Sequence, residues 1–185
     1  MKKTRRHQQD SNDEPEGKMV ADAKQSPQAF VAIYDRYVNQ IYHYFLSHVG
    51  NSVEAQDLTS HVFLSALDGL ATYQHRGHFA AWLFTIARHT WVDYYRQDHK
   101  EVPLEAVINL PSKDDPSCEI INLEEIQKIR KAVYKLSEDD QELIRLRFVA
   151  RLKFAEIALI LGCKEEAAKK RVYRLLARLE NEMEI

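Results

Sequence analysis

The sequence predicts an all-α protein made of two small helical domains joined by a flexible linker. The 185 residues include only five Gly and five Pro, too few for the many turns of an all-β fold. Apolar residues recur at helical spacing over long stretches. Three of the prolines, Pro103, Pro111 and Pro116, fall close together, and proline interrupts helices.

These features divide the chain into four parts. Residues 1–25 are polar, of mixed charge and without periodicity, so we expect a disordered tail. Residues 26–100 are expected to form the N-terminal domain, residues 101–118 the linker, and residues 119–185 the C-terminal domain.

The N-terminal domain is expected to contain three helices. The first carries apolar residues from Phe30 to Phe45, and Gly50-Asn51-Ser52 is expected to end it and to cap the second. The third is expected over about Phe79–Arg96. The second helix is expected to bury one stripe of side chains: Val53, Leu58, Val62, Phe63, Ala66, Leu67 and Leu70.

The C-terminal domain is expected to contain four helices, the last two with helix-turn-helix spacing. Gly162 stands at the turn, where a positive φ is needed. We expect the inward positions to be Ile157, Leu161, Cys163, Ala168 and Val172. The outward face of the last helix is basic and is expected to contact DNA through Lys164, Lys169, Lys170, Arg171, Arg174 and Arg178. A helical hairpin with a solvated basic face is the alternative.

Charge is unevenly distributed along the chain. The formal net charge is only −2, but residues 143–180 hold ten Lys and Arg against four Asp and Glu. Residues 101–142 have the opposite balance, with five basic and eleven acidic residues. A basic C-terminal block can attract phosphates although the total is near neutral.

Residues 73–96 alternate aromatic side chains with Arg and His, a pairing used by proteins that bind single-stranded DNA. The alternative is that these are core residues at helical spacing: Phe79, Leu83, Ile86 and Trp82. His75 and His78 lack a third ligand nearby in sequence, so we expect surface histidines and no metal.

Several functional classes are not expected. Two cysteines cannot form a disulfide framework, and no run of about 18 apolar residues is present, so we expect no direct membrane insertion. No apolar segment follows the basic N-terminus as in a secretory signal. We find no catalytic constellation and no phosphate-binding loop. The expectation is a cytoplasmic protein that is not an enzyme and needs no cofactor.

Taken together, the motifs resemble the sigma-70 family of RNA polymerase sigma factors, in its extracytoplasmic-function (ECF) branch. The segments Asp57–Leu67 and Phe79–Arg88 are similar to region 2, and Leu136–Phe148 with the helix-turn-helix is similar to region 4. Departures include His61 at a usually acidic position, and Lys164 where a Ser usually caps the recognition helix.

The resemblance implies a division of labour between the two domains. Asp57, Leu58, Val62 and Phe63 would bind the clamp coiled coil of the polymerase largest subunit, and the polymerase flap region would be a further contact. The basic helix after Lys164 would read the −35 element, and an anti-sigma factor is an expected partner. The promoter −10 element would be melted and read by Tyr73, Arg76, Trp82, Arg88, His89 and Arg96.

Two other hypotheses remain open from the sequence. The first is a helix-turn-helix regulator that does not form an active holoenzyme. The second is a helical adaptor that binds polymerase without reading DNA. The segment Asp57–Leu67 argues against the first alternative, because an ordinary repressor needs no polymerase-binding helix. The basic residues at 169–174 argue against the second.

Overall fold

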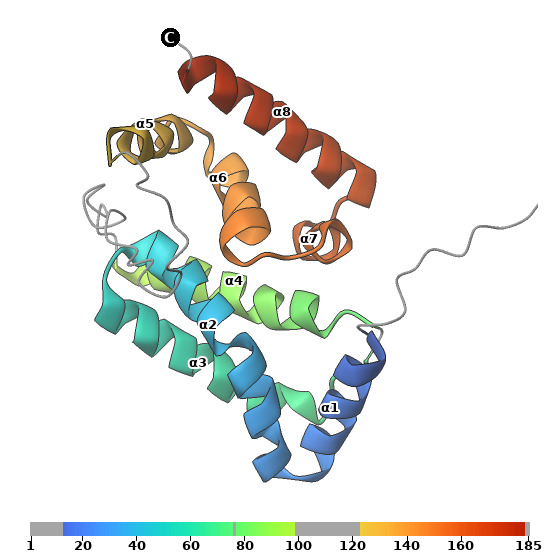
Figure 1. Cartoon of the computed structure of the whole chain (residues 1–185). Helices are drawn as coiled ribbons and strands as arrows, with labels where there is room; N and C mark the ends of the chain where they lie inside the picture. Colours follow the sequence, from blue (N-terminus) through green and yellow to red (C-terminus); the bar gives the residue numbers. More distant parts are fainter. Residues whose placement is uncertain (1–12, 76, 99–122, 184–185) are drawn as a thin grey trace, which may run out of the picture.

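A computed structural model of the chain describes residues 13–75, 77–98 and 123–183, and every regular element in these ranges is helical (Figure 1). The all-α prediction is therefore confirmed. The N-terminal domain contains α1 (Asp13–Gln25), a short 3₁₀ turn (Pro27–Ala29), α2 (Phe30–Val49), α3 (Ser52–Leu70) and α4 (Phe79–Asp98). The C-terminal domain contains α5 (Leu123–Tyr134), α6 (Glu138–Ile144), the π-helical turn η3 (Arg145–Val149), α7 (Phe154–Leu161) and α8 (Glu165–Met183).

Helix α1 corrects the expectation of a disordered tail over residues 1–25. Residues 13–25 form a helix that packs on α2 and buries Val20 and Ala23. The prediction failed because α1 buries few apolar side chains, which leaves little helical periodicity to detect. A further buried residue, Glu16, is polar and does not contribute to an apolar pattern. Residues 1–12 lie outside the described part of the chain, as does the expected linker 101–118.

The corner between α2 and α3 forms as the sequence predicts. Gly50 adopts a left-handed conformation with φ of 65°, which ends α2 at little steric cost. The Asn51 side-chain oxygen then accepts hydrogen bonds from the backbone N–H of Val53 (2.9 Å) and Glu54 (3.4 Å). These bonds satisfy two of the free N–H groups at the start of α3.

Helices α2, α3 and α4 pack around one apolar core, in which Ile33, Ile41 and Leu83 are fully buried. The C-terminal domain lies directly on this bundle rather than apart from it. In Figure 1, α4 lies between α3 on one side and α6 and α7 on the other, and contacts join α4 to α7 and α2 to η3. Buried apolar residues of both domains thus form one continuous cluster.

Helices α7 and α8 form the predicted helix-turn-helix. Gly162 ends α7 with φ of 64°, and Cys163 N donates to Ala158 O at 2.9 Å across the turn. Ile157, Ala168 and Val172 are buried as expected. Cys163 is exposed, contrary to expectation, because the residue after Gly162 lies on the outer side of the turn.

Two left-handed residues near the helix-turn-helix should respond oppositely to substitution. Gly162→Ala should lower the free energy of unfolding by about 1 kcal/mol, because its φ of 64° strains any side chain even though a Cβ added there would have no atom within 4 Å. Arg151→Gly should not destabilise, because Arg151 already has φ of 56° and glycine relieves that strain. Denaturant unfolding measures both. A neutral Gly162→Ala variant would contradict the strain argument.

Candidate nucleic-acid and polymerase interfaces

The outer face of α3 presents apolar side chains to solvent. Val53 and Leu64 are each 62% exposed and Leu67 is 40% exposed, and they recur along the helix at the spacing of a single face. Asp57 is exposed on the same helix. The result is a mixed apolar and acidic surface of the kind that protein partners cover.

The structure changes the residues assigned to this face. Leu58, Val62 and Phe63, which were expected to contact polymerase, are buried, with Phe63 packed against Phe30 and Tyr34, so they form the core side of α3 in this structure. Val53 and Leu67 were expected in the core and are exposed instead. Periodicity alone could not separate two apolar stripes on one helix.

An aromatic cluster lies where α3 turns into α4. The ring of Tyr73 is 4.6 Å from that of Trp82 and 5.4 Å from that of Phe79, measured between centroids. Phe79 is fully buried, whereas Tyr73 and Trp82 are half-buried and keep part of their rings in solvent. Gly69 lets Trp82 lie close to α3, because a Cβ there would be 3.3 Å from the indole. The partly open rings can accept an unstacked base.

Basic side chains continue along α4 from this cluster. His89 and Arg96 are exposed, and each lies a multiple of seven residues after Trp82, so all three share one face. Arg88 is half-buried, and its positive charge acts to lower the pKa of the Tyr44 hydroxyl on α2. Arg76 lies outside the described residues. The structure therefore groups Trp82, His89 and Arg96 and separates Arg88 from them.

Helix α8 presents a basic face to solvent. Its exposed members are Lys164, which precedes the helix, Lys169, Lys170, Arg174 and Arg178. Arg178 also lies 3.3 Å from Glu182 in an exposed ion pair that adds little stability. A helix with this charge, preceded by the α7 turn, can lie in a DNA major groove and contact phosphates and base edges.

Arg171 differs from the rest of this face. Its Nε donates to Asp140 Oδ1 of α6 at 2.6 Å, and both side chains are partly buried. Asp140 is also one of the residues that Ser137 caps at the start of α6. Arg171 thus fixes α8 against α6, a role that its place among basic residues did not reveal.

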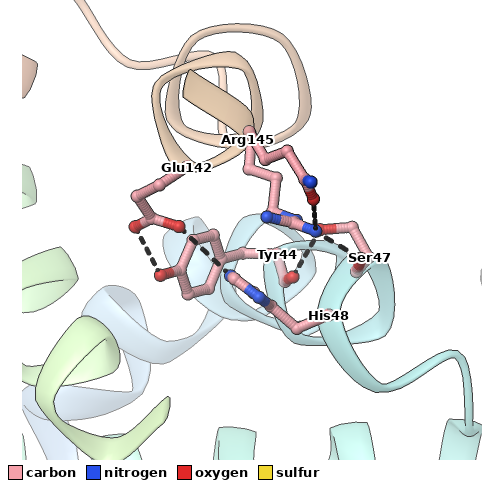
Figure 2. A network of polar contacts seen from close by, with 6 residues as sticks. Tyr44, Ser47, His48, Glu142 and Arg145 are labelled. Atoms are coloured by element: carbon pink, nitrogen blue, oxygen red, sulfur yellow. Dashed lines mark hydrogen bonds and ion pairs between the residues drawn. The ribbon is translucent and has the colours of Figure 1, made fainter. Parts of the chain in front are cut away.

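A polar network joins the two domains, and we call it the domain seam: Tyr44, Ser47 and His48 of α2 with Glu142 of α6 and Arg145 of η3 (Figure 2). Tyr44 OH donates to Glu142 Oε1 at 2.8 Å, and His48 Nε2 lies 3.3 Å from Glu142 Oε2. Arg145 Nε donates to Ser47 O at 3.4 Å. The Trp91 ring of α4 stacks on His48 at 4.3 Å.

Burial sets the protonation states at the domain seam. It lowers the pKa of His48 to about 4, with help from the positive charge of Arg145, so the imidazole is neutral at pH 7. Burial also raises the pKa of Tyr44, so the hydroxyl stays protonated and donates a hydrogen bond to the Glu142 carboxylate. Burial alone would raise the pKa of Glu142, but the contacts with His48 and Tyr44 and the charge of Arg145 hold it below the usual value.

Two classes of site are not found in the described ranges. Residues 13–75, 77–98 and 123–183 contain no group of three His, Cys, Asp or Glu side chains able to hold a metal ion. None of the helices described here is long and apolar enough to cross a bilayer.

The fold and these surfaces define a two-domain helical protein of the nucleic-acid-binding class. Comparison with known proteins identifies its family. The sequence matches the profile of Sigma-70 region 2 over residues 33–101 and that of Sigma-70 region 4 over residues 126–179. The chain belongs to the sigma-70 family of RNA polymerase sigma factors, in its ECF branch.

Individual relatives agree with this assignment. The chain is 30% identical over 152 residues to the RNA polymerase sigma factor YlaC of Bacillus subtilis, covering 80% of this chain and 87% of YlaC. It is 34% identical over 158 residues to the ECF sigma factor BldN of Streptomyces coelicolor, covering 82% of this chain but only 60% of BldN. The chain thus spans less than two thirds of the length of BldN.

Solved structures share the fold. CnrH, solved in complex with the cytosolic domain of CnrY, superposes with a TM-score of 0.67 at 21% identity over 90% of this chain and 95% of that one. The sigma factor RpoE of Bartonella quintana, solved with the anti-sigma factor NepR, gives 0.63 at 21% identity over 84% and 97%.

The domain seam should make stability depend on pH. In the folded protein His48 has a pKa of about 4, whereas the unfolded chain has the usual value near 6.5. The unfolded state therefore binds the proton first, and stability should fall as pH falls from about 6.5 to about 4, by at most about 3 kcal/mol. Thermal unfolding at constant ionic strength measures this.

Matched variants separate His48 from other histidines. His48→Gln removes the titrating group and should flatten the profile between pH 6.5 and 4.5, above the range in which Glu142 takes up a proton. His61→Gln, at an exposed position, should leave the profile unchanged. The assignment fails if both variants keep the wild-type slope.

Proposed function

We propose that this chain is a sigma factor that binds core RNA polymerase and directs promoter-specific transcription initiation. The N-terminal domain melts and reads the −10 element, and the C-terminal domain reads the −35 element. One observation carries the proposal: an aromatic cluster with adjacent exposed cations and a basic recognition helix occur together in one chain of the sigma-70 family.

The outer face of α3 is the proposed contact with the clamp coiled coil of polymerase. Asp57 remains the polar member of this contact, and Val53, Leu64 and Leu67 replace the three buried residues as its apolar members. Leu58, Val62 and Phe63 support the face from the core.

The −10 element would be held by the Tyr73 and Trp82 rings, with His89 and Arg96 along the strand. Each base stacked on an aromatic ring contributes roughly 1–3 kcal/mol, which offsets the cost of unpairing. The −35 duplex would be contacted by Lys169, Lys170 and Arg174 of α8. Glu165 and Glu166 at the tip of α8 repel phosphates and can accept a hydrogen bond from a cytosine amino group.

The proposal requires the domain seam to open. Elements at −10 and −35 are ~25 base pairs apart, or about 85 Å of duplex. A compact chain of this length has a radius of gyration of only about 16 Å.

An anti-sigma factor is the second proposed partner. CnrH and RpoE, which share this fold, were solved with CnrY and with the anti-sigma factor NepR, respectively. A partner that covers both domains while they are packed together would keep the domain seam closed and the two DNA-reading faces apart from their promoter elements.

Run-off transcription with purified core polymerase and genomic DNA fragments tests the proposal. The chain should bind core polymerase and yield specific start sites that core polymerase alone does not. Duplex binding without core binding would support the regulator alternative. Core binding without specific starts would support the adaptor.

Variants of α8 sharpen the same experiment. Lys169→Ala with Lys170→Ala should weaken promoter binding and reduce the slope of log affinity against log salt by about 2, because each lost phosphate contact removes about one released counterion. Lys128→Ala with Lys131→Ala, two exposed positions on α5, should change neither. Loss of core binding in the α8 variant would contradict the assignment of this helix.

A further inference from the structure

Helix α1 lies outside the residues that match region 2, yet it contacts the turn that carries the aromatic cluster. Glu16 is only 5% exposed. It accepts a hydrogen bond from Tyr37 OH of α2 and another from the backbone N–H of Phe79 at 3.4 Å. One side chain of α1 thus joins α2 to the start of α4.

Phe79 is the first residue of α4, which gives the second bond a particular role. The first N–H groups of a helix have no partner within the helix, and negative charge is favoured there. A buried carboxylate fixed by Tyr37 supplies both the acceptor and the charge. Glu16 therefore caps the first N–H of α4 from a different helix.

Helix α1 also lies against the turn between α3 and α4 at two more positions. A Cβ on Gly17 would lie 3.2 Å from His75 Nε2, so only glycine leaves this ring in place without a shift. Lys24 Nζ donates to the backbone O of Tyr73 and lies 5.9 Å from the centre of its ring. Helix α1 thus meets the turn near its start, its middle and its end.

We propose that α1 positions the −10 binding cluster, with Glu16, Gly17 and Lys24 as positioning residues. They contact no DNA themselves and act through Tyr73 and Phe79, on which the Trp82 ring packs. This inference rests on the proposed function. It makes residues 13–25 part of the promoter-melting unit rather than a dispensable extension.

The test measures promoter opening by full-length variants bound to core polymerase, with 2-aminopurine in the −10 element as the reporter. Glu16→Ala should slow opening roughly tenfold, the effect of losing a hydrogen bond to a charged group. Glu16→Gln should stay within about threefold of wild type, because its amide oxygen can still accept from Phe79 N–H while its NH2 group donates to the Tyr37 hydroxyl oxygen. Asp22→Asn, at an exposed position on α1, is the matched control. Affinity for core polymerase should be unchanged in all three.

Gly17→Ala separates positioning from folding. Alanine has a higher helix propensity than glycine, so α1 should be at least as stable in this variant. The added methyl group should nevertheless displace His75 and slow promoter opening severalfold. Lys24→Met should slow it as well, whereas Lys18→Met, at an exposed position, should not. An equal loss of thermal stability and opening in Gly17→Ala would indicate a purely structural role and overturn the inference.

The outcomes distinguish this inference from the proposed function. If the wild-type chain opens no promoter, the proposed function fails. If wild type opens promoters and Glu16→Ala, Gly17→Ala and Lys24→Met match it, the role of α1 fails while the sigma-factor function stands.

Discussion

The arrangement of the two domains depends on the buried carboxylate of Glu142. It takes a hydrogen bond from Tyr44 and lies 3.3 Å from Nε2 of the neutral His48, and both partners belong to the other domain. A buried carboxylate is costly to leave without donors: losing a hydrogen bond to a charged group typically costs about 1.5–3 kcal/mol. The contact therefore specifies one docking geometry, and α4 also contacts α7 across the same boundary.

The same contact creates a conflict with promoter binding. The surfaces proposed to read DNA are accessible while the domains are packed, since His89 and Arg96 of α4 and Lys169 of α8 are exposed. Accessibility is not sufficient, because one compact body cannot reach two distant promoter elements. The proposed function therefore requires polymerase and promoter to supply enough binding energy to separate the domains, and tethering both to one polymerase would make the second contact intramolecular.

The sequence predicted those features that depend on local chemistry. The Gly50–Asn51 corner and the Gly162 turn follow from backbone conformation and capping, and both were located correctly. Prediction from the sequence failed where the role of a residue depends on a partner that is distant in the chain. Nothing near Arg171 in sequence indicates Asp140, and nothing near Glu142 indicates Tyr44. For the same reason residues 13–25 look like a tail in sequence, because the residue that anchors α1 is a carboxylate.

The distance between the two domains, compared in the free and the promoter-bound protein, tests domain opening most directly. Spin labels at the exposed positions Ser65 of α3 and Ala177 of α8, with Cys118 and Cys163 replaced by Ser, report this distance. We expect one short distance in the free protein and an increase of several tens of ångströms in the open complex with core polymerase. A distance that stays unchanged on promoter binding would contradict the opening of the domain seam.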